Sequence, residues 1–165
     1  MKMLGYVAGA VLAVGCTALC PGQAVASPLQ CISTGDQKLT VIEGGTACGS
    51  EAVANGAAAA YGIDGIGYAK AIGGATALGL GVSGGVGASE GVGGVPIAIG
   101  LGPGSVAIVS VDYGAMSLAV AFPGSQALVA NSDQGVVCAG GAAFAWNMLA
   151  GKACIATGAG ILALG

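Results

Sequence analysis

The sequence has no histidine, and its four basic residues are all lysines, set against seven acidic residues. Without an imidazole, serine–histidine catalysis and histidine-ligated metal sites are excluded. With so few cations, the chain cannot assemble a basic patch for nucleic-acid phosphates or for an anionic membrane surface. We therefore expect no nucleic-acid partner, no cofactor and no metal site.

Large side chains are also scarce: aromatic residues make up 4% of the chain, whereas it contains 34 glycines. Each glycine in a regular element costs about 0.5–1 kcal/mol relative to alanine. Alanine in turn buries little surface compared with valine, leucine or isoleucine, each of which contributes about 1.5–3 kcal/mol when buried. A core of such small side chains is marginal, so we expect covalent cross-links to support it.

The first 26 residues have the pattern of an export signal. Lys2 provides a positive start, residues 4–19 are apolar, and Ala24-Val25-Ala26 matches an A-x-A cleavage site. This pattern predicts cleavage between Ala26 and Ser27, and hence a secreted or cell-envelope protein. A retained membrane anchor is less favoured, because the run is short and ends in a processing motif.

The same segment has a second interpretation, a lipoprotein signal. Ala13-Val14-Gly15-Cys16 resembles a bacterial lipobox, in which Cys16 would be acylated and would become the mature N-terminus. Cleavage after Ala26 instead removes both Cys16 and Cys20 and leaves an even number of cysteines. The even number favours a signal peptide, with anchoring through Cys16 as the alternative.

The remaining cysteines are Cys31 and Cys48 near one end, and Cys138 and Cys154 near the other. Four cysteines allow three connectivities. We predict the bridges Cys31–Cys48 and Cys138–Cys154, because each closes a short local loop worth about 3 kcal/mol in the chain-entropy model. Neither pair has the C-x-x-C spacing of a metal site. The pattern is typical of an oxidising, extracytoplasmic compartment.

The middle of the chain repeats short apolar pieces that end in glycine, proline, asparagine or aspartate. One set is centred on small residues about twenty apart, namely Ala77, Ala98, Ala119 and Cys138. A second set lies between them and begins at Tyr68, Val86, Ser105 and Gln126. Two β-prone pieces per step predict an all-β fold, a parallel β-solenoid or β-roll of about five short rungs. Inward-facing Ala, Val, Ile and Leu would form its ladders, with glycines at the corners.

The predicted organisation follows from these pieces. It comprises a signal peptide (1–26), an N-terminal disulfide cap (27–55), a Gly/Ala-rich solenoid (56–135) and a C-terminal disulfide cap (136–165).

Within the C-terminal cap, Cys138 and Cys154 are expected at matching places in neighbouring rungs. Phe144 and Trp146 are interpreted as a plug over the open end, with a short helix over residues 142–150 as the alternative. Residues 91–111 are uncharged and long enough to span a bilayer, but their glycines and prolines argue against it. No transmembrane span is therefore expected in the mature chain.

Few residues are candidates for chemistry or binding. Glu90 with Asp112 or Asp64 is the candidate carboxylate pair for glycosidic chemistry, although solvated turns are the simpler interpretation of all three. The stretch that carries Tyr61, Asp64 and Tyr68 is the most polar and aromatic one outside the ends. These three residues are the candidate contact surface.

Three segments carry a resemblance to a known family. The run GIDGIGYAKAIGGATALGLGVSGGVGASEGVGGVPIAIGLGPGS, with TVIEGGTACGS before it and GVVCAGGAAFAWN after it, resembles uncharacterised exported Ala/Gly-rich proteins of mycobacteria and related actinobacteria. The resemblance covers most of the mature chain and implies an envelope or extracellular location without an assigned activity.

The pieces TALGLG, PIAIG and SVAIV are in addition similar to the repeats of trimeric autotransporter adhesin heads, which are left-handed β-rolls. The step is longer here and no coiled-coil stalk follows, so trimerisation is not carried over.

Together these observations predict a non-enzymatic, secreted or cell-envelope protein with a structural or protein-interaction role. Its partners would be cell-envelope components or another protein, and the sequence leaves its oligomeric state open. The alternatives are a carboxylate-dependent enzyme acting on cell-wall glycans and a lipoprotein anchored through Cys16.

Overall fold

The computed structural model describes residues 27–114, 116–131 and 135–165. The predicted signal segment, with Cys16, Cys20 and Ala26, lies outside the described residues. The described part contains fifteen strands: β1 (Leu29–Thr34), β2 (Lys38–Glu43), β3 (Thr46–Val53), β4 (Ala57–Ile63), β5 (Ile66–Ile72), β6 (Thr76–Val82), β7 (Val86–Val92), β8 (Val95–Leu101), β9 (Val106–Asp112), β10 (Met116–Ala121), β11 (Gln126–Val129), β12 (Val136–Ala139), β13 (Ala142–Asn147), β14 (Lys152–Thr157) and β15 (Gly160–Leu164).

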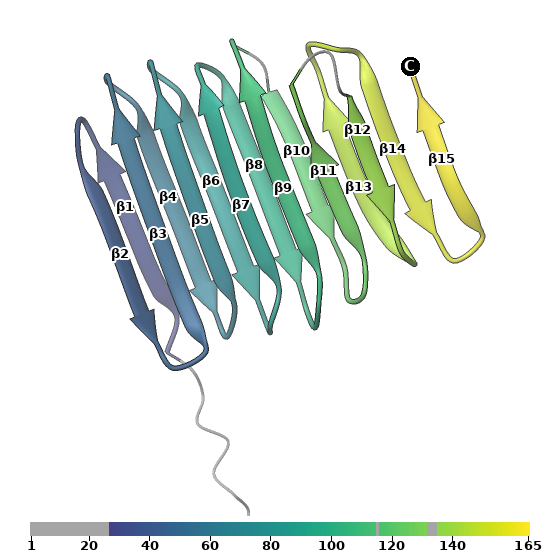
Figure 1. Cartoon of the computed structure of the whole chain (residues 1–165), viewed down its shortest axis with the longest axis horizontal. Helices are drawn as coiled ribbons and strands as arrows, with labels where there is room; N and C mark the ends of the chain where they lie inside the picture. Colours follow the sequence, from purple (N-terminus) through teal and green to yellow (C-terminus); the bar gives the residue numbers. More distant parts are fainter. Residues whose placement is uncertain (1–26, 115, 132–134) are drawn as a thin grey trace, which may run out of the picture.

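The strands form two sheets that lie face to face (Figure 1). Sheet A has the order β1-β4-β6-β8-β10-β13-β14-β15, and sheet B has the order β12-β11-β9-β7-β5-β3-β2. The chain alternates between them from β3 to β11, and neighbouring strands over that stretch are parallel. The predicted parallel β-solenoid is therefore confirmed, with about four turns.

The step of the solenoid is 19 to 21 residues. Ala57 pairs with Thr76, Ile66 with Val86, and Val95 with Met116. The predicted match of Ala98 with Ala119 is present in the β8–β10 pair. Ala77 is out of phase with that column, because Ala98 pairs with Gly79 instead. The glycine-rich pattern therefore predicts the length of the step correctly, but it places Ala77 two residues away from the true partner of Ala98, which is Gly79.

Of the predicted inward ladders of alanine, valine, isoleucine and leucine, alanine is present throughout, whereas larger residues are buried only toward the ends, as at Leu29, Val109 and Val129. The inward positions of β4 to β8 are occupied by Ala, Gly and Ser, with Pro96 as the largest. A Cβ atom on Gly79 would lie 1.9 Å from the Tyr68 carbonyl oxygen of the other sheet, and one on Gly100 would lie 2.2 Å from the Val86 carbonyl oxygen. Backbone thus packs directly against backbone, far closer than the usual sheet separation of about 10 Å.

Both predicted disulfides are present, and each joins the two sheets. Cys31 of β1 is bonded to Cys48 of β3, with Cα atoms 5.6 Å apart. Cys138 of β12 is bonded to Cys154 of β14, with Cα atoms 5.9 Å apart. The second bridge therefore crosses the thin core, whereas the expectation placed it between neighbouring rungs of one stack. Two intramolecular disulfides indicate an oxidising environment.

The ends of the solenoid are closed by antiparallel strands. At the N-terminal end β1 and β2 pair antiparallel with β4 and β3, and at the C-terminal end β12 and β13 pair antiparallel with β11 and β10. Sheet A then continues through β14 and β15.

The interpretation of Phe144 and Trp146 as a plug is wrong. Both lie on β13 and point outward, while the intervening Ala143 and Ala145 are buried. The side chains that β13 turns inward are Ala143, Ala145 and Asn147, and the two aromatic rings occupy the alternate, outward positions. The alternative helix over residues 142–150 is also wrong, since most of this segment forms β13. Residues 91–111 lie mainly in β8 and β9, and in the described part of the chain no helix has the length and apolarity to cross a membrane.

Candidate interaction surface

The outer face of sheet A is covered by aligned apolar side chains, and we call it the sheet A face. Because side chains alternate along a strand and the step brings each outward residue beside its equivalent, the register produces continuous columns. One column runs Ala59–Leu78–Ile97–Leu118–Trp146–Ala153–Leu164, and the next runs Tyr61–Leu80–Ile99–Val120–Phe144–Ile155–Leu162.

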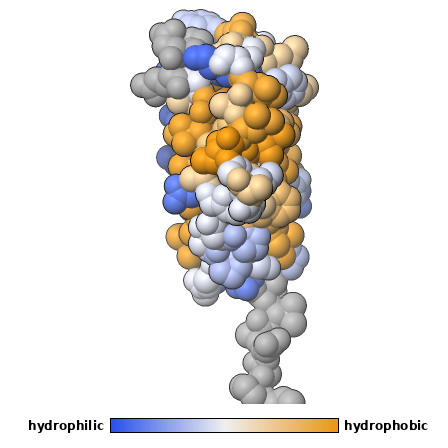
Figure 2. Space-filling model, turned by 90° about the vertical axis from the view of Figure 1, so that its right-hand side faces the viewer, coloured by the Kyte–Doolittle hydropathy of each residue, from blue (hydrophilic) through white to orange (hydrophobic). Residues whose placement is uncertain are grey.

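Among the described residues, the outward positions of β4, β6, β8, β10 and β13 carry no charged side chain. Side chains inside the columns are half-buried by their neighbours, whereas those toward the C-terminal edge are more open. Leu162 is 58% exposed and Leu164 is 54% exposed. Figure 2 views the molecule from this end, over β15, and shows hydrophobic residues gathered across its middle. A contiguous apolar face of this extent is characteristic of an interaction site.

The outer face of sheet B differs, because it carries a ladder of alternating charges. Lys38, Glu51, Lys70 and Glu90 are direct neighbours on β2, β3, β5 and β7. The Lys38 Nζ lies 3.0 Å from the Glu51 Oε2, and the Lys70 Nζ lies 3.1 Å from the Glu90 Oε1.

These contacts change the proton affinities of two groups. The hydrogen bond from Lys38 holds the pKa of the Glu51 carboxyl below its ordinary value, and the attraction of Lys38 and Lys70 adds to this effect. The hydrogen bond to the Glu90 carboxylate, together with its charge, raises the pKa of Lys70.

Two shallow hollows flank Tyr68 on the outer face of sheet B. One, of about 280 Å³, lies over Gly49 between Thr40 and Ile66. The other, of about 150 Å³, is lined by Ala88, Glu90 and Ile108, among others. They exist because small residues, Gly49 and Ala88, stand on either side of Tyr68 in its row.

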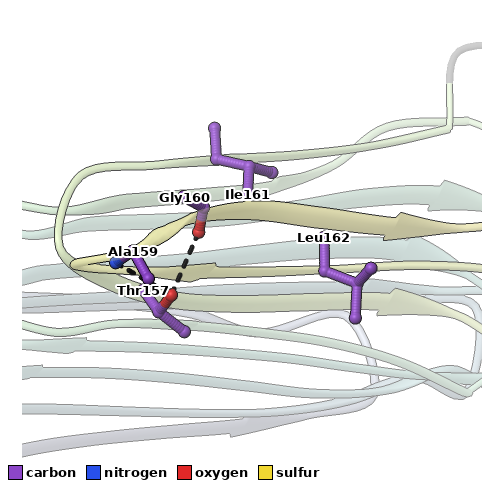
Figure 3. Close-up of a pocket in the computed structure, with 5 residues that line it drawn as sticks. All are labelled: Thr157, Ala159, Gly160, Ile161 and Leu162. Carbon is purple, nitrogen blue, oxygen red and sulfur yellow. Dashed lines mark hydrogen bonds between the residues drawn. The ribbon is translucent and has the colours of Figure 1, made fainter.

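A third hollow, of about 250 Å³, lies at the β14–β15 turn (Figure 3). There the Thr157 Oγ1 accepts a hydrogen bond from the Ala159 N–H and donates one to the Gly160 carbonyl oxygen. These bonds complete a tight turn, and the turn itself accounts for the polar atoms drawn in the figure.

The structure does not bring the predicted contact residues Tyr61, Asp64 and Tyr68 together. Tyr61 is on the sheet A face, where its hydroxyl accepts a hydrogen bond from the Gln30 amide at 3.1 Å. Tyr68 points outward from sheet B, on the opposite side of the molecule. Asp64 lies in the turn between them, with a φ of 51°. Neighbours in sequence are separated because the chain changes sheets at this turn.

The three carboxylates considered for catalysis are also dispersed. Glu90 is paired with Lys70, and Asp112 ends the adjacent strand β9 on the same face. Asp64 lies at the opposite end of the strands. It comes just before β5, whose first residue is level with the first residue of β9, whereas Asp112 is the last residue of β9. A strand of seven residues separates the two aspartates by about 20 Å. Within residues 27–114, 116–131 and 135–165, no group of three or more Cys, Asp or Glu side chains is placed to hold a metal ion.

The sheet A face and the charge ladder escaped sequence reasoning, although the signal for the face is visible. In LGLG (78–81) and IAIG (97–100) a large residue alternates with a small one at every second position. Such alternation specifies two sides of a strand. Such alternation alone does not say which side is the interior. On these strands the thin core holds only Ala, Gly and Pro, so the large residues predicted to lie inside face outward.

A family model described as a family of unknown function, DUF6764, matches residues 1–157. The chain belongs to this family. Comparison with curated proteins and with solved structures found no match. The expectation of an uncharacterised family is therefore confirmed, whereas the actinobacterial origin and the likeness to adhesin heads stay predictions.

Proposed function

We propose that the protein is a non-catalytic interaction module, secreted or held in the cell envelope, that binds a protein partner through the sheet A face. The observation that carries the proposal is the uncharged apolar surface formed by the two side-chain columns. Exposing such a surface to water is unfavourable, and covering it with another protein removes the cost. The rigid, disulfide-closed solenoid supports the role by holding the columns flat.

Two further observations support the proposal. The two disulfides fit an extracytoplasmic location. The dispersed carboxylates, one of them engaged by Lys70, favour a binding role over glycosidic chemistry, which needs two carboxyl groups flanking one bond.

Site-specific photo-crosslinking in the producing cells tests the proposal. A photoreactive phenylalanine analogue at Ile99, on the sheet A face, should give covalent protein adducts after illumination. The matched control places the analogue at Ile108, which is 38% exposed on the outer face of sheet B. Adducts confined to Ile99 support the proposed surface. Equal adducts from both positions, or none from Ile99, would reject it.

A further inference from the structure

We infer that the sheet A face is covered by a second copy of this chain, packed face to face about a two-fold axis. The inference rests on the proposed function, because it names the partner of the same surface. Three observations select a second copy: the size of the face, its lack of charge, and the placement of the large side chains.

The size of the face is that of a stable dimer interface. Strands of six or seven residues are about 21 Å long, and six neighbouring strands from β4 to β14 span about 29 Å. Each copy would therefore contribute about 600 Å² of projected area, and a pair about 1,200 Å². Specific protein interfaces bury about 1,200–2,000 Å² in total, and accessible area exceeds projected area because side chains are rough.

The distribution of charge makes the face compatible with itself. In a two-fold dimer the same patch meets itself, so a charge near the axis would meet its own copy, and a charge elsewhere would need an opposite charge at the position it faces. The described outward residues of β4, β6, β8, β10 and β13 carry none, and Lys152 of β14 pairs with the buried Asn147, in an inward-facing row. The charge ladder of Lys38, Glu51, Lys70 and Glu90 is on sheet B and would remain in water.

The large side chains are outside the solenoid, so a conventional core exists only if two faces meet. Leu80, Ile99 and Val120 stand in one column on the outer side, while Gly79, Ala98 and Ala119 occupy the neighbouring inner positions. Two sheets with branched side chains pack at about 10 Å and interdigitate. Such a sandwich between copies would bury the aliphatic columns together with Phe144 and Trp146.

A lipid surface is the competing occupant, and the composition of the face disfavours it. Interfacial membrane binding is commonly strengthened by Lys and Arg beside the apolar surface, where they attract anionic headgroups. The cations of the described part are Lys38 and Lys70 on sheet B, and Lys152 at the start of β14. Lys38 and Lys70 therefore face away from the sheet A face, and Lys152 pairs with the buried Asn147, outside the outward columns.

Sedimentation equilibrium of the protein as its host exports it, with both disulfides formed, tests the inference. We expect a concentration-dependent monomer–dimer equilibrium. Replacing Ile99 by lysine in the centre of the face should weaken dimerisation at least about 100-fold, because an unpaired charge would be buried. Replacing Ile108 by lysine on sheet B should leave it unchanged. Far-UV circular dichroism verifies that both variants keep the β-fold.

Trp146, the one tryptophan of the chain, provides a second readout. Its emission should shift to longer wavelength on dilution of the wild type, and Ile99→Lys should show the shifted emission at every concentration. Flotation with vesicles of phosphatidylcholine, with and without phosphatidylglycerol, measures the lipid alternative.

The outcomes separate the inference from the proposed function. A monomer at all concentrations up to about 100 µM, with adducts to another protein from Ile99, overturns the second copy but keeps the proposed function. A monomer that binds vesicles and gives no protein adducts overturns both and makes the face a lipid-binding surface. A monomer with neither overturns both. A dimer that Ile99→Lys and Ile108→Lys leave equally intact also overturns the inference, since another surface would then hold the copies together.

Discussion

At the residue scale, glycine has two separate roles in this fold, and only one of them is conformational. At the turns it accepts positive φ values, as at Gly74 with a φ of 80°. In the strands it provides room, because the opposing backbone lies where a Cβ atom would be. The sequence predicts the first role from turn patterns. The second depends on the distance between the sheets, which no local pattern encodes.

Gly79→Ala tests the role of glycine as a spacer. Its Cβ atom would lie 1.9 Å from the Tyr68 carbonyl oxygen, so the sheets must separate. We expect the free energy of unfolding to fall by about 3 kcal/mol or more, as for severe overpacking. The control is Gly45→Ala, where nothing lies within 4 Å of the added atom and φ is not positive. Urea unfolding gives both values, and equal losses at the two positions would contradict the account of the core.

The charge ladder leads to a prediction about pH. Glu51 has a lowered pKa in the folded state, so its contribution to stability is present above the ordinary value of 4.5 and is lost as pH falls through the folded pKa. Lys70 has a raised pKa, so its contribution is complete below 10.5 and is lost as pH rises through the folded pKa. Thermal unfolding should therefore show lower midpoints on both sides.

Matched variants separate the loss of stability at acid pH from the loss at alkaline pH. Glu51→Gln should reduce mainly the loss of stability at acid pH, with a smaller effect at alkaline pH because the Glu51 charge also helps to raise the pKa of Lys70. Glu90→Gln should reduce mainly the alkaline loss, because it removes the hydrogen-bond partner of Lys70. Exposed ion pairs are screened, so salt should shrink both effects. If the unfolding midpoints of both variants changed with pH as those of the wild type do, other groups would control the pH dependence.

At the scale of elements, each end of the solenoid combines antiparallel strands with a disulfide across the core. The pairing of the cysteines was predictable, because short loops are the cheapest to close. The direction of the bridge was not, since it depends on which sheet each strand joins. β12 belongs to sheet B. β13 pairs antiparallel with β10 in sheet A and β14 pairs with β13, so Cys154 is in the opposite sheet from Cys138.

Removing the bridge Cys138–Cys154 by alanine at both positions should destabilise the C-terminal end. The bridge closes a loop with a sequence separation of 16, for which the chain-entropy model gives about 3 kcal/mol. Hydrogen exchange should accelerate in β12 to β15, while the amides of β5 to β8 keep their protection. Uniform acceleration along the chain would show that the ends and the middle unfold as one unit.

At the scale of the whole molecule, the solenoid is a one-dimensional stack, in which each strand contacts the strands beside it and those opposite. The step and the all-β class were readable from the chain, because both depend on local alternation and turn residues. The inside-out placement of large and small residues was not. The alternation in LGLG and IAIG indicates that the two faces of each strand differ. Which face is the interior depends on the distance between the sheets, which the local sequence does not encode.

A stack of equivalent rungs should tolerate the loss of one rung if the register is kept. Deleting residues 86–105 removes β7, β8 and their turns, and joins Gly85 to Val106. Val86 and Val106 pair as equivalent positions, so β9 can take the place of β7 beside β5. Leu78 and Leu118 both pair with Ile97 in the intact protein, so β10 can likewise take the place of β8 beside β6. The shortened chain should fold with a β-type circular dichroism spectrum and a lower unfolding midpoint.

The control deletes residues 86–95, which is half a rung. This deletion places a sheet A strand where a sheet B strand belongs, and it should abolish cooperative unfolding. If both deletions unfolded alike, the rungs would not be interchangeable, and stability would depend on contacts specific to β7 and β8.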